Sequence, residues 1–373
     1  MRRLGNLKHA ALLLAFALLI TACGGGGQGG GSQQQYTFDY ANVLQSGALF
    51  VAVGDGVKSA AATSGIKLKY YDNQYPSAET ALRNARLMVQ DKPDVIIDYQ
   101  AVAGIGDSVA KMFNNAKIPC IAVNVPMNGC SWFNLVNREI GTDTAKVVLP
   151  VLQSKGWSGS DTIVLFLQSA SAGTEVNDCI RYFYVTLSQS LPGFTVAQPS
   201  DITASTTRIG GSGWQLEGGG KLDQSYTAVK NTLQTIPADK HIVLYSINDD
   251  SVLGGWRAIT EAHREANSLV AGLGSDEQSR QQLRTNPQWV AEGELFPSMW
   301  GEYLMAMGVA TLKGHKPPKL TKTPQVVMTK DTVSKYFKPG SDQPIALPPL
   351  SPEDQYLKDA GILQKFHNIQ GLS

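Results

Sequence analysis

The feature that most constrains the fold of this 373-residue chain is a regular alternation of short strands with helical segments. Two early segments alternate polar and apolar side chains, and two later ones are short apolar runs of the kind buried in parallel sheets. Strand–helix–strand order of this kind predicts a parallel sheet with helices on both faces. The predicted strands are residues 36–41, 66–71, 95–97 and 118–123, and the predicted helices are residues 48–62, 77–90 and a segment through Val109 and Phe113.

The alternation breaks near residues 126–129 and then restarts, so the chain is expected to form two α/β lobes of the Rossmann-like kind. The second set of predicted strands is residues 162–167, 194–197, 241–245 and 269–273. Residues 203–224 interrupt the rhythm with a Ser/Thr run and two glycine clusters, and loops of that length are usually functional or mobile. Residues 338–373 are rich in proline and are expected to form a loosely attached tail with a short helix at 353–360.

The first 35 residues predict export and attachment to a membrane. Arg2, Arg3 and Lys8 precede an uncharged apolar run at 10–20, and small residues lead to Cys23. This order is typical of a secretory signal, and the run is too short for a permanent membrane span. It resembles a bacterial lipoprotein signal, with residues 1–22 removed and Cys23 lipidated. The alternative is an ordinary secretion signal with an incidental cysteine.

Composition narrows the possible partners further. Residues 24–35 contain only Gly, Gln and Ser, which predicts a flexible tether, so residues 23–35 would join lipid to the folded domain. The formal net charge of +1 becomes 1 − 3 = −2 without Arg2, Arg3 and Lys8, so we expect no nucleic-acid partner.

Export permits a disulfide between two of the remaining cysteines, and their odd number leaves at least one free. The sequence does not choose between Cys120, Cys130 and Cys179.

Motifs for enzymatic chemistry are absent from the sequence. Gly218 to Lys221 is similar to a phosphate-binding loop, but Leu222 stands where Ser or Thr is needed and Gln215 where Gly is needed. No two histidines have the i, i+3 or i, i+4 spacing of a metal site. We therefore expect no cofactor, no metal and no catalysis. Asp249 and Asp250 follow a predicted strand, where an α/β protein binds ligands, so ligand binding is favoured over acid–base catalysis.

Several segments together resemble the type I solute-binding proteins of bacterial ABC transporters, in particular the ribose/galactose-like sugar-binding group. The resemblance covers roughly residues 36–337. It implies two lobes joined by three crossovers, with a ligand in the interlobe cleft and a permease that receives it. The N-terminal lobe would comprise residues 36–125 and 296–323, and the C-terminal lobe residues 128–294 and 324–337. The matching segments are residues 50–56, 92–97, 118–124, 136–141, 247–255 and 297–301.

The resemblance also implies a set of ligand-binding residues. An aromatic ring would stack on the sugar, and Asp, Asn and Arg would exchange hydrogen bonds with its hydroxyl groups. Two positions depart from the family pattern, because Gly274 stands where Asp is usual and Leu295 where Gln is usual at a crossover. The implied ligand residues are Phe50, Asp98 directly after strand 95–97, Asn124 at the first crossover, Arg181, Asn248 and Asp249.

Four of the implied residues also have a purely structural interpretation. Asp98 could cap a helix, Arg181 could form a surface ion pair, Asn248 could hold its own turn, and Phe50 could be core. The sequence as a whole predicts a lipid-anchored, monomeric solute receptor of an ABC importer, outside the cytoplasm, for a monosaccharide or related polyol. Alternatives are a receptor that signals to a membrane sensor and, less favoured, a secreted carbohydrate-active enzyme using Asp98, Asp249 or Asp250.

Overall fold

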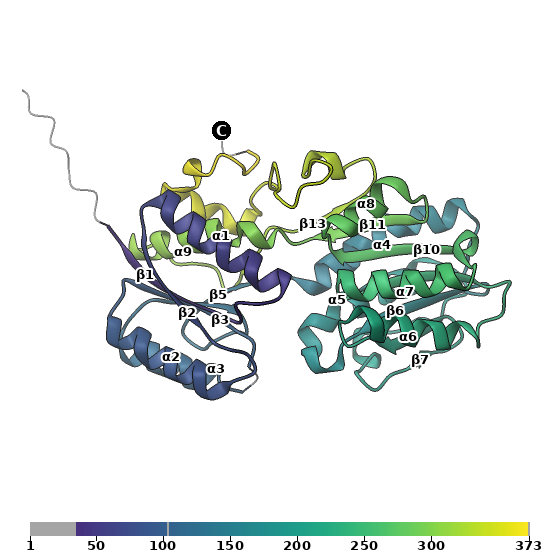
Figure 1. Ribbon diagram of the computed structural model, residues 1–373, viewed down its shortest axis with the longest axis horizontal. Coiled ribbons are helices and arrows are strands. Elements are labelled where there is room, and N and C mark those ends of the chain that lie inside the picture. Colours follow the sequence, from purple (N-terminus) through teal and green to yellow (C-terminus); the bar gives the residue numbers. More distant parts are fainter. Residues whose placement is uncertain (1–34, 103, 372–373) are drawn as a thin grey trace, which may run out of the picture. The chain divides into compact units, whose positions relative to one another are not determined.

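A computed structural model describes residues 35–102 and 104–371 (Figure 1). The predicted signal, Cys23 and the tether up to residue 34 lie outside the described residues. The described chain folds around two separate sheets, each dominated by parallel strands.

The first lobe contains a parallel sheet whose order, among the described residues, is β12-β5-β4-β3-β1-β2. Helices α1 and α9 cover one face of this sheet, and α2 and α3 cover the other (Figure 1). The strands are β1 Thr37–Asn42, β2 Lys67–Asp72, β3 Val95–Gln100, β4 Cys120–Asn124, β5 Ser131–Asn134 and β12 Thr321–Lys322. The helices are α1 Ala48–Ser64, α2 Ala78–Asp91, α3 Gly106–Asn115 and α9 Trp300–Leu312, which follows the 3-10 helix η4 Pro297–Met299.

Helix α9 is the most deeply buried helix of this lobe within the described residues. Its side chains from Trp300 to Ala310 are all buried, because α1 and the sheet lie on one side and the C-terminal segment lies on the other. The crossing with α1 depends on glycine, since a Cβ at Gly301 would lie 2.3 Å from the backbone oxygen of Gly56. The two backbones therefore touch where α9 begins, which fixes the start of this helix against α1.

The second lobe contains a sheet in the order β13-β11-β10-β9-β6-β8-β7 within the described residues. Its central strands are parallel, and the edge strands β7 and β13 run antiparallel to their neighbours. Helices α4 and α5 pack together, as do α6 and α7, while α8 packs on β11. The bounds are α4 Asn137–Ser154, β6 Thr162–Gln168, α5 Gly173–Ser190, β7 Arg208–Ile209, β8 Gly213–Glu217, α6 Leu222–Leu233, β9 His241–Ser246, α7 Asp249–Glu261, β10 Ser268–Gly274, α8 Glu277–Thr285, β11 Trp289–Glu294 and β13 Val326–Met328.

One predicted strand is wrong, and its replacement lies inside the predicted loop. Residues 194–197 form no strand, because Thr195 donates its backbone N–H to the Ser212 hydroxyl, and its backbone oxygen accepts from the Tyr184 hydroxyl. Strand β8 pairs with β6 instead. The loop before it is also ordered, since Gln215 Nε2 donates to the backbone oxygens of Thr203 and Thr206 at 2.8 and 2.7 Å.

The boundary between the lobes lies later than the predicted residue 128. Strand β5 pairs with β4 and β12, so residues 131–134 belong to the first sheet. A disulfide between Cys120 and Cys130 ties the start of β4 to the residue before β5, and Cys179 is buried elsewhere on α5. The chain leaves this lobe at Leu135, so Asn124 does not stand at a crossover, contrary to expectation.

In the described chain, connections between the sheets run through residues 135–136, 295–299 and 323–325. The first and last are tied together, because Gln325 Oε1 accepts the Val136 N–H at 3.1 Å and the Thr323 N–H donates to the Asn134 oxygen at 3.1 Å. Leu295 lies in the second connection of the chain. These short, cross-bonded segments are the geometry expected of a hinge.

The C-terminal segment is not the loosely attached tail that the sequence predicted. Leu347, Leu357 and Leu363 are at most 1% exposed. The segment contains the 3-10 helices η5 Val333–Lys335, η6 Pro352–Ala360 and η7 Leu363–Lys365, and η6 packs on α9. Its prolines hinder regular ladders but do not prevent burial of the apolar side chains between them.

Candidate functional site

The candidate site is built from side chains at the carboxyl ends of the parallel strands, where open α/β sheets bind ligands. In the first lobe, Asn42 ends β1 and organises the start of α1. Its Nδ2 donates to the backbone oxygen of Phe50 at 2.8 Å, and its Oδ1 accepts from the Tyr40 hydroxyl at 2.9 Å. The Phe50 ring is half-buried and meets the ring of Tyr99 edge-on, with centroids 5.8 Å apart. Phe50 thus has both a packing partner and accessible surface.

Asp98 lies inside β3, not directly after it, because the strand continues to Gln100. Its carboxylate is 1% exposed and accepts a hydrogen bond from Asn73 Nδ2 at 2.9 Å. Burial raises the pKa of Asp98 to about 6, and the bond from Asn73 opposes this shift. The structure therefore places Asp98 behind the surface of the site rather than capping a helix.

Gln100 is a site candidate that sequence reasoning missed. Its Oε1 accepts the N–H groups of Ala101 and Val102 at 3.0 and 2.9 Å, which fixes the amide. Its Nε2 is buried and has no hydrogen-bond partner among the described residues. The apolar run 95–97 is followed by Asp98, Tyr99 and Gln100, so the sequence pattern placed the end of the strand at residue 97. Because β3 continues to Gln100, this residue lies at the carboxyl end of the strand.

Asn124 stands beside Gln100 on the neighbouring strand. The two residues are register partners, and Asn124 Nδ2 donates to the Gln100 backbone oxygen at 3.0 Å. Asn124 has φ of +71°, a conformation that Asn tolerates better than most residues. Its backbone oxygen accepts from Trp132 Nε1 at 3.0 Å. The structure thus brings Gln100 and Asn124 together at one edge.

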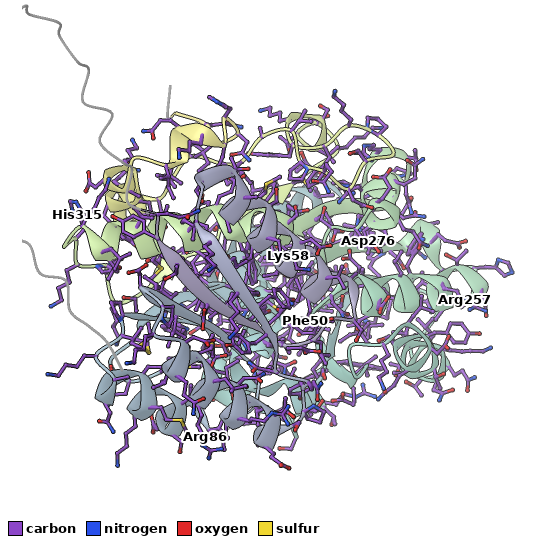
Figure 2. The ribbon with its side chains drawn as sticks, turned by 60° about the vertical axis from the view of Figure 1, so that its left-hand side comes forward. Phe50, Lys58, Arg86, Arg257, Asp276 and His315 are labelled. Atoms are coloured by element: carbon purple, nitrogen blue, oxygen red, sulfur yellow. A yellow bond between two sulfur atoms is a disulfide. The ribbon has the colours of Figure 1, made fainter. Side chains whose placement is uncertain are left out.

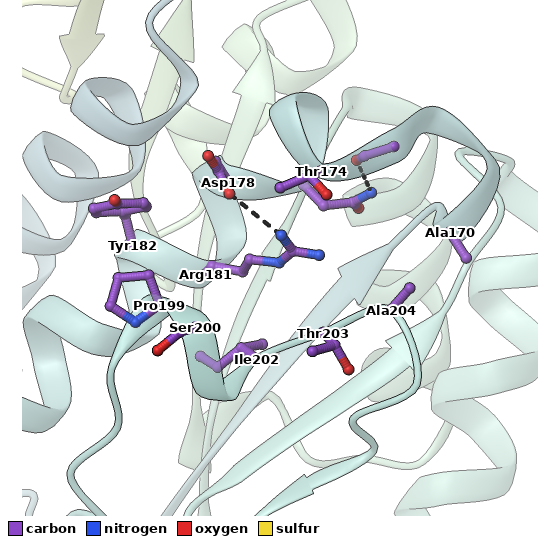
Figure 3. Close-up of a pocket in the computed structure, with 12 residues that line it drawn as sticks. Ala170, Thr174, Asp178, Arg181, Tyr182, Pro199, Ser200, Ile202, Thr203 and Ala204 are labelled. Atoms are coloured by element: carbon purple, nitrogen blue, oxygen red, sulfur yellow. Dashed lines mark hydrogen bonds and ion pairs between the residues drawn. The ribbon is translucent and has the colours of Figure 1, made fainter. Parts of the chain in front are cut away.

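In the second lobe, a hollow of about 460 Å³ lies beside the first half of α5 (Figure 3). Helix α5 forms one wall and the segment from Pro199 to Ala204 forms another. Asn177 holds the start of α5, because its Oδ1 accepts the Ser169 N–H and its Nδ2 donates to the backbone oxygens of Ser169 and Gly173. Of the six predicted ligand residues, all within the described chain, Arg181 is the one in this wall.

Arg181 is buried, which argues against a surface ion pair. It is 6% exposed, and its Nη1 lies 3.4 Å from Asp178 Oδ1, a long contact for a charged pair. Its Nε is buried without a hydrogen-bond partner in the described part of the chain. Burial raises the pKa of Asp178, and the Arg181 charge opposes that shift. A buried guanidinium with spare donors can bind the hydroxyl or carboxyl oxygens of a ligand.

Asn248 and Asp249 form the start of α7. Asn248 Oδ1 accepts the Ser251 N–H at 3.0 Å, so Asn248 holds its own turn as a helix cap, and its Nδ2 donates to the Gly220 oxygen at 3.0 Å. The second bond attaches the glycine-rich loop to α7. Asp249 Oδ1 accepts the Ser275 N–H at 2.9 Å, and burial followed by the charge of Asp276 raises the pKa of Asp249.

Two buried glutamates lie behind Asp249. Glu292 accepts from Trp289 Nε1 at 2.7 Å, and burial raises the pKa of Glu292 well above its usual value. Burial also raises the pKa of Glu294 to about 8. Strand β10 makes room for the carboxyl groups, since a Cβ at Gly274 would lie 2.1 Å from Asp249 Oδ2 and one at Gly272 would lie 2.3 Å from Glu292 Oε2. The Asp249 carboxyl thus occupies space that a side chain at Gly274 would need.

Within the described residues, no three His, Cys, Asp or Glu side chains are placed to hold a metal ion. Across those same residues, no helix is both long and apolar enough to cross a bilayer. The groups described above, at the carboxyl ends of the strands and along the hollow, are amides, carboxyls, the Arg181 guanidinium and aromatic rings. These groups suit the directed hydrogen bonds and one apolar face of a small polar solute.

The fold is that of two-lobed α/β binding proteins of the first structural type. Residues 39–316 match the family model for the periplasmic binding protein domain, and the chain belongs to this family. Among curated proteins, the chain has no match.

Solved structures share the fold at low sequence identity. An ABC transporter solute-binding protein from Mycobacterium smegmatis with bound glycerol is 17% identical, with 83% of this chain and 98% of that chain covered and a TM-score of 0.66. The arabinose-binding component from Shewanella sp. ANA-3, bound to L-arabinofuranose, is 20% identical, with 80% and 93% covered and a TM-score of 0.62. A solute-binding protein from Actinobacillus succinogenes 130z with bound D-allose is 14% identical, with 81% and 100% covered and a TM-score of 0.62.

Proposed function

We propose that this protein is the extracytoplasmic substrate-binding protein of an ABC importer and that it binds a monosaccharide or related polyol between its lobes. The observation that carries the proposal is the placement of polar and aromatic side chains at the carboxyl ends of the parallel strands in the two sheets. The chain belongs to this family, and the connections between its lobes have the geometry of a hinge. The bound arabinofuranose, allose and glycerol in similar structures support the choice of ligand class. No bond is made or broken in this function, since binding is coupled to hinge closure.

Within this proposal, the two lobes contribute different groups. In the first lobe, Phe50 offers a ring face, while Gln100 and Asn124 offer amides, and Asp98 acts through Asn73. In the second lobe, Arg181 offers a charged hydrogen-bond donor, and Asn248 and Asp249 stand at the start of helix α7. Closure would bury these groups, so a sugar lacking one hydroxyl would leave a partner unsatisfied at a cost of about 1–3 kcal/mol.

The remaining parts of the proposal concern location and partners. We propose that Cys23 carries a lipid anchor, that the receptor is monomeric and that a membrane permease receives the solute. The resemblance of residues 1–23 to a lipoprotein signal supports the anchor. Mass spectrometry of membrane-extracted protein tests it, with a lipidated Cys23 as the new N-terminus expected. An unmodified Cys23 with the signal still attached would contradict it.

The ligand is tested by calorimetry with a panel of pentoses, hexoses and polyols. We expect micromolar or tighter binding of at least one of them, and weakening by roughly 10- to 100-fold in Arg181→Ala, because hydrogen bonds to charged groups contribute about 1.5–3 kcal/mol. Arg257→Ala is the matched control, since Arg257 is an exposed arginine on α7 of the same lobe. No binding across the panel, or equal affinity in the Arg181 variant, would overturn the ligand class or the site respectively.

A further inference from the structure

The C-terminal segment 336–369, called the strap below, contacts both lobes. It lies beyond residues 39–316, which match the family model, so the family match says nothing of its role. After β13 and η5 the chain is still attached to the second lobe, and residues from Leu347 onward pack on the first (Figure 1). The strap therefore makes another passage between the lobes besides the three connections described above.

Helix α8 holds the strap to the second lobe. Glu277 Oε1 accepts the Gly340 N–H at 2.8 Å. Arg280 Nη2 donates to the Ser341 oxygen at 2.9 Å and to Asp342 Oδ1 at 2.6 Å. Arg280 is 2% exposed, whereas the Asp342 side chain that it binds is 76% exposed, so the arginine is shielded from water and its carboxylate partner is not. Each of these bonds has a charged donor or acceptor, and charge-assisted hydrogen bonds are stronger than neutral ones, so α8 is the attachment point of the strap on the second lobe.

The same attachment touches the second connection between the lobes. Arg280 lies over the ring of Phe337 at 4.1 Å, and Phe337 stacks on Phe296 with centroids 6.0 Å apart and planes 6° apart. Phe296 lies in the connection itself and has φ of +47°. Arg280 Nη1 is also 4.0 Å from Glu294 Oε2, at the end of β11. The strap and the hinge segment thus share one buried arginine.

A different set of contacts holds the strap to the first lobe. Asn368 Nδ2 donates to Glu302 Oε1 at 2.6 Å, and Lys313 Nζ donates to the Ala360 oxygen at 2.7 Å. The Tyr356 and Thr321 hydroxyls lie 2.6 Å apart, which joins η6 to β12. Together with the buried Leu347, Leu357 and Leu363 around α9, these contacts make the second attachment broad and apolar.

The link between the two attachments is very short. Ile345 donates its N–H to the Tyr336 oxygen at 2.7 Å on the second-lobe side, and Leu347 donates its N–H to the Asn368 oxygen at 2.8 Å on the first-lobe side. Only Ala346 separates them. Because a residue spans at most about 3.6 Å, this link has almost no slack. Separation of the lobes at this edge would have to break one of the attachments.

We propose that the strap is a fourth tie between the lobes that limits how far they open in the ligand-free protein. The inference rests on the hinge movement in the proposed function. An importer receptor that opens less keeps a larger fraction of its binding-competent form, which raises its apparent affinity. The strap therefore restricts the open state rather than contacting the solute.

The test lengthens the link while leaving both attachments intact. Six Gly/Ser residues are inserted between Ala346 and Leu347, adding up to about 20 Å of reach. A matched insertion between Ala238 and Asp239 lengthens an exposed turn within the second lobe. Spin labels at Arg86→Cys on α2 and Arg257→Cys on α7, both exposed, report the interlobe distance in the full chain without ligand (Figure 2). Labelled protein without the two substitutions measures background from native cysteines.

We expect the Ala346 insertion to broaden the distance distribution and extend it by several ångströms or more, whereas the Ala238 insertion leaves it unchanged. An unchanged distribution in the Ala346 insertion would overturn the proposal. Equal broadening by both insertions would also overturn it, because the effect would then be unrelated to the strap. Since no sugar is added, this result is independent of whether the proposed ligand class is correct.

Discussion

Replacing Glu302 by Gln tests the attachment of the strap to the first lobe. Glu302 is 7% exposed on α9, and its Oε1 accepts from Asn368 Nδ2 at 2.6 Å. Glu302 Oε2 and Asn368 Oδ1 are both buried without partners among the described residues. A buried carboxylate oxygen without a donor disfavours the charged form of the carboxyl group. Burial raises the pKa of Glu302 from 4.5 to about 7, and the Asn368 bond opposes that shift.

The raised pKa of Glu302 sets the sign of its effect on stability as pH changes. Because the folded-state pKa exceeds the unfolded value, Glu302 contributes stability that is fully present below about pH 4.5 and is lost as pH rises through about 7. With one pKa unit equal to about 1.4 kcal/mol, the loss between about pH 5 and pH 8 is roughly 2.5 kcal/mol. The Glu302→Gln side chain would keep the bond from Asn368 and offer a neutral donor to Asn368 Oδ1, so the variant should lack this loss.

The measurement is the free energy of unfolding from urea titrations at about pH 5 and pH 8. Other buried carboxyl groups with raised pKa values, such as Asp98, also make the parent less stable at high pH, so the comparison between variants isolates Glu302. We expect Glu302→Gln to be more stable than the parent at pH 8, and close to it at pH 5. Glu353→Gln, which changes an exposed carboxyl of η6, is the control. If the free energy of unfolding changed equally with pH in the parent and in Glu302→Gln, the reasoning would be refuted.

Three further outcomes are expected. Cys120→Ser with Cys130→Ser should lower the free energy of unfolding by about 2–3 kcal/mol, as loop closure over a separation of 10 residues predicts, and a loss smaller than about 1 kcal/mol would contradict this. Gly141→Ala should destabilise the second lobe in thermal unfolding, since the new Cβ would lie 2.0 Å from the Cys179 oxygen, and wild-type stability would disprove the contact. Gln100→Ala should weaken sugar binding in calorimetry, and unchanged affinity would remove Gln100 from the site.

Much of the fold could be predicted because its signals are local. The runs at 95–97, 162–167 and 241–245 lie within β3, β6 and β9, since consecutive apolar residues are needed where both faces of a strand are covered. The resemblance to two-lobed binding proteins was confirmed by the family match over 39–316.

The site was less predictable because it depends on where strands end. Asp98 was placed after β3, whereas the strand continues through Asp98 and brings Gln100 to the edge. Arg181 was chosen from a resemblance, and no local pattern shows that its guanidinium is buried beside a hollow. Such positions depend on contacts between segments far apart in the chain.

By itself, the sequence determined the two α/β units, the predicted export signal and the absence of a recognised catalytic motif, because each is written in short stretches of composition and periodicity. Only the tertiary structure decided that β5 belongs to the first sheet, that β8 arises from a glycine-rich stretch and that the proline-rich end is a strap between lobes. The reason is physical. Strand partners and lobe contacts are set by long-range burial and hydrogen bonding, which a local pattern permits but does not specify.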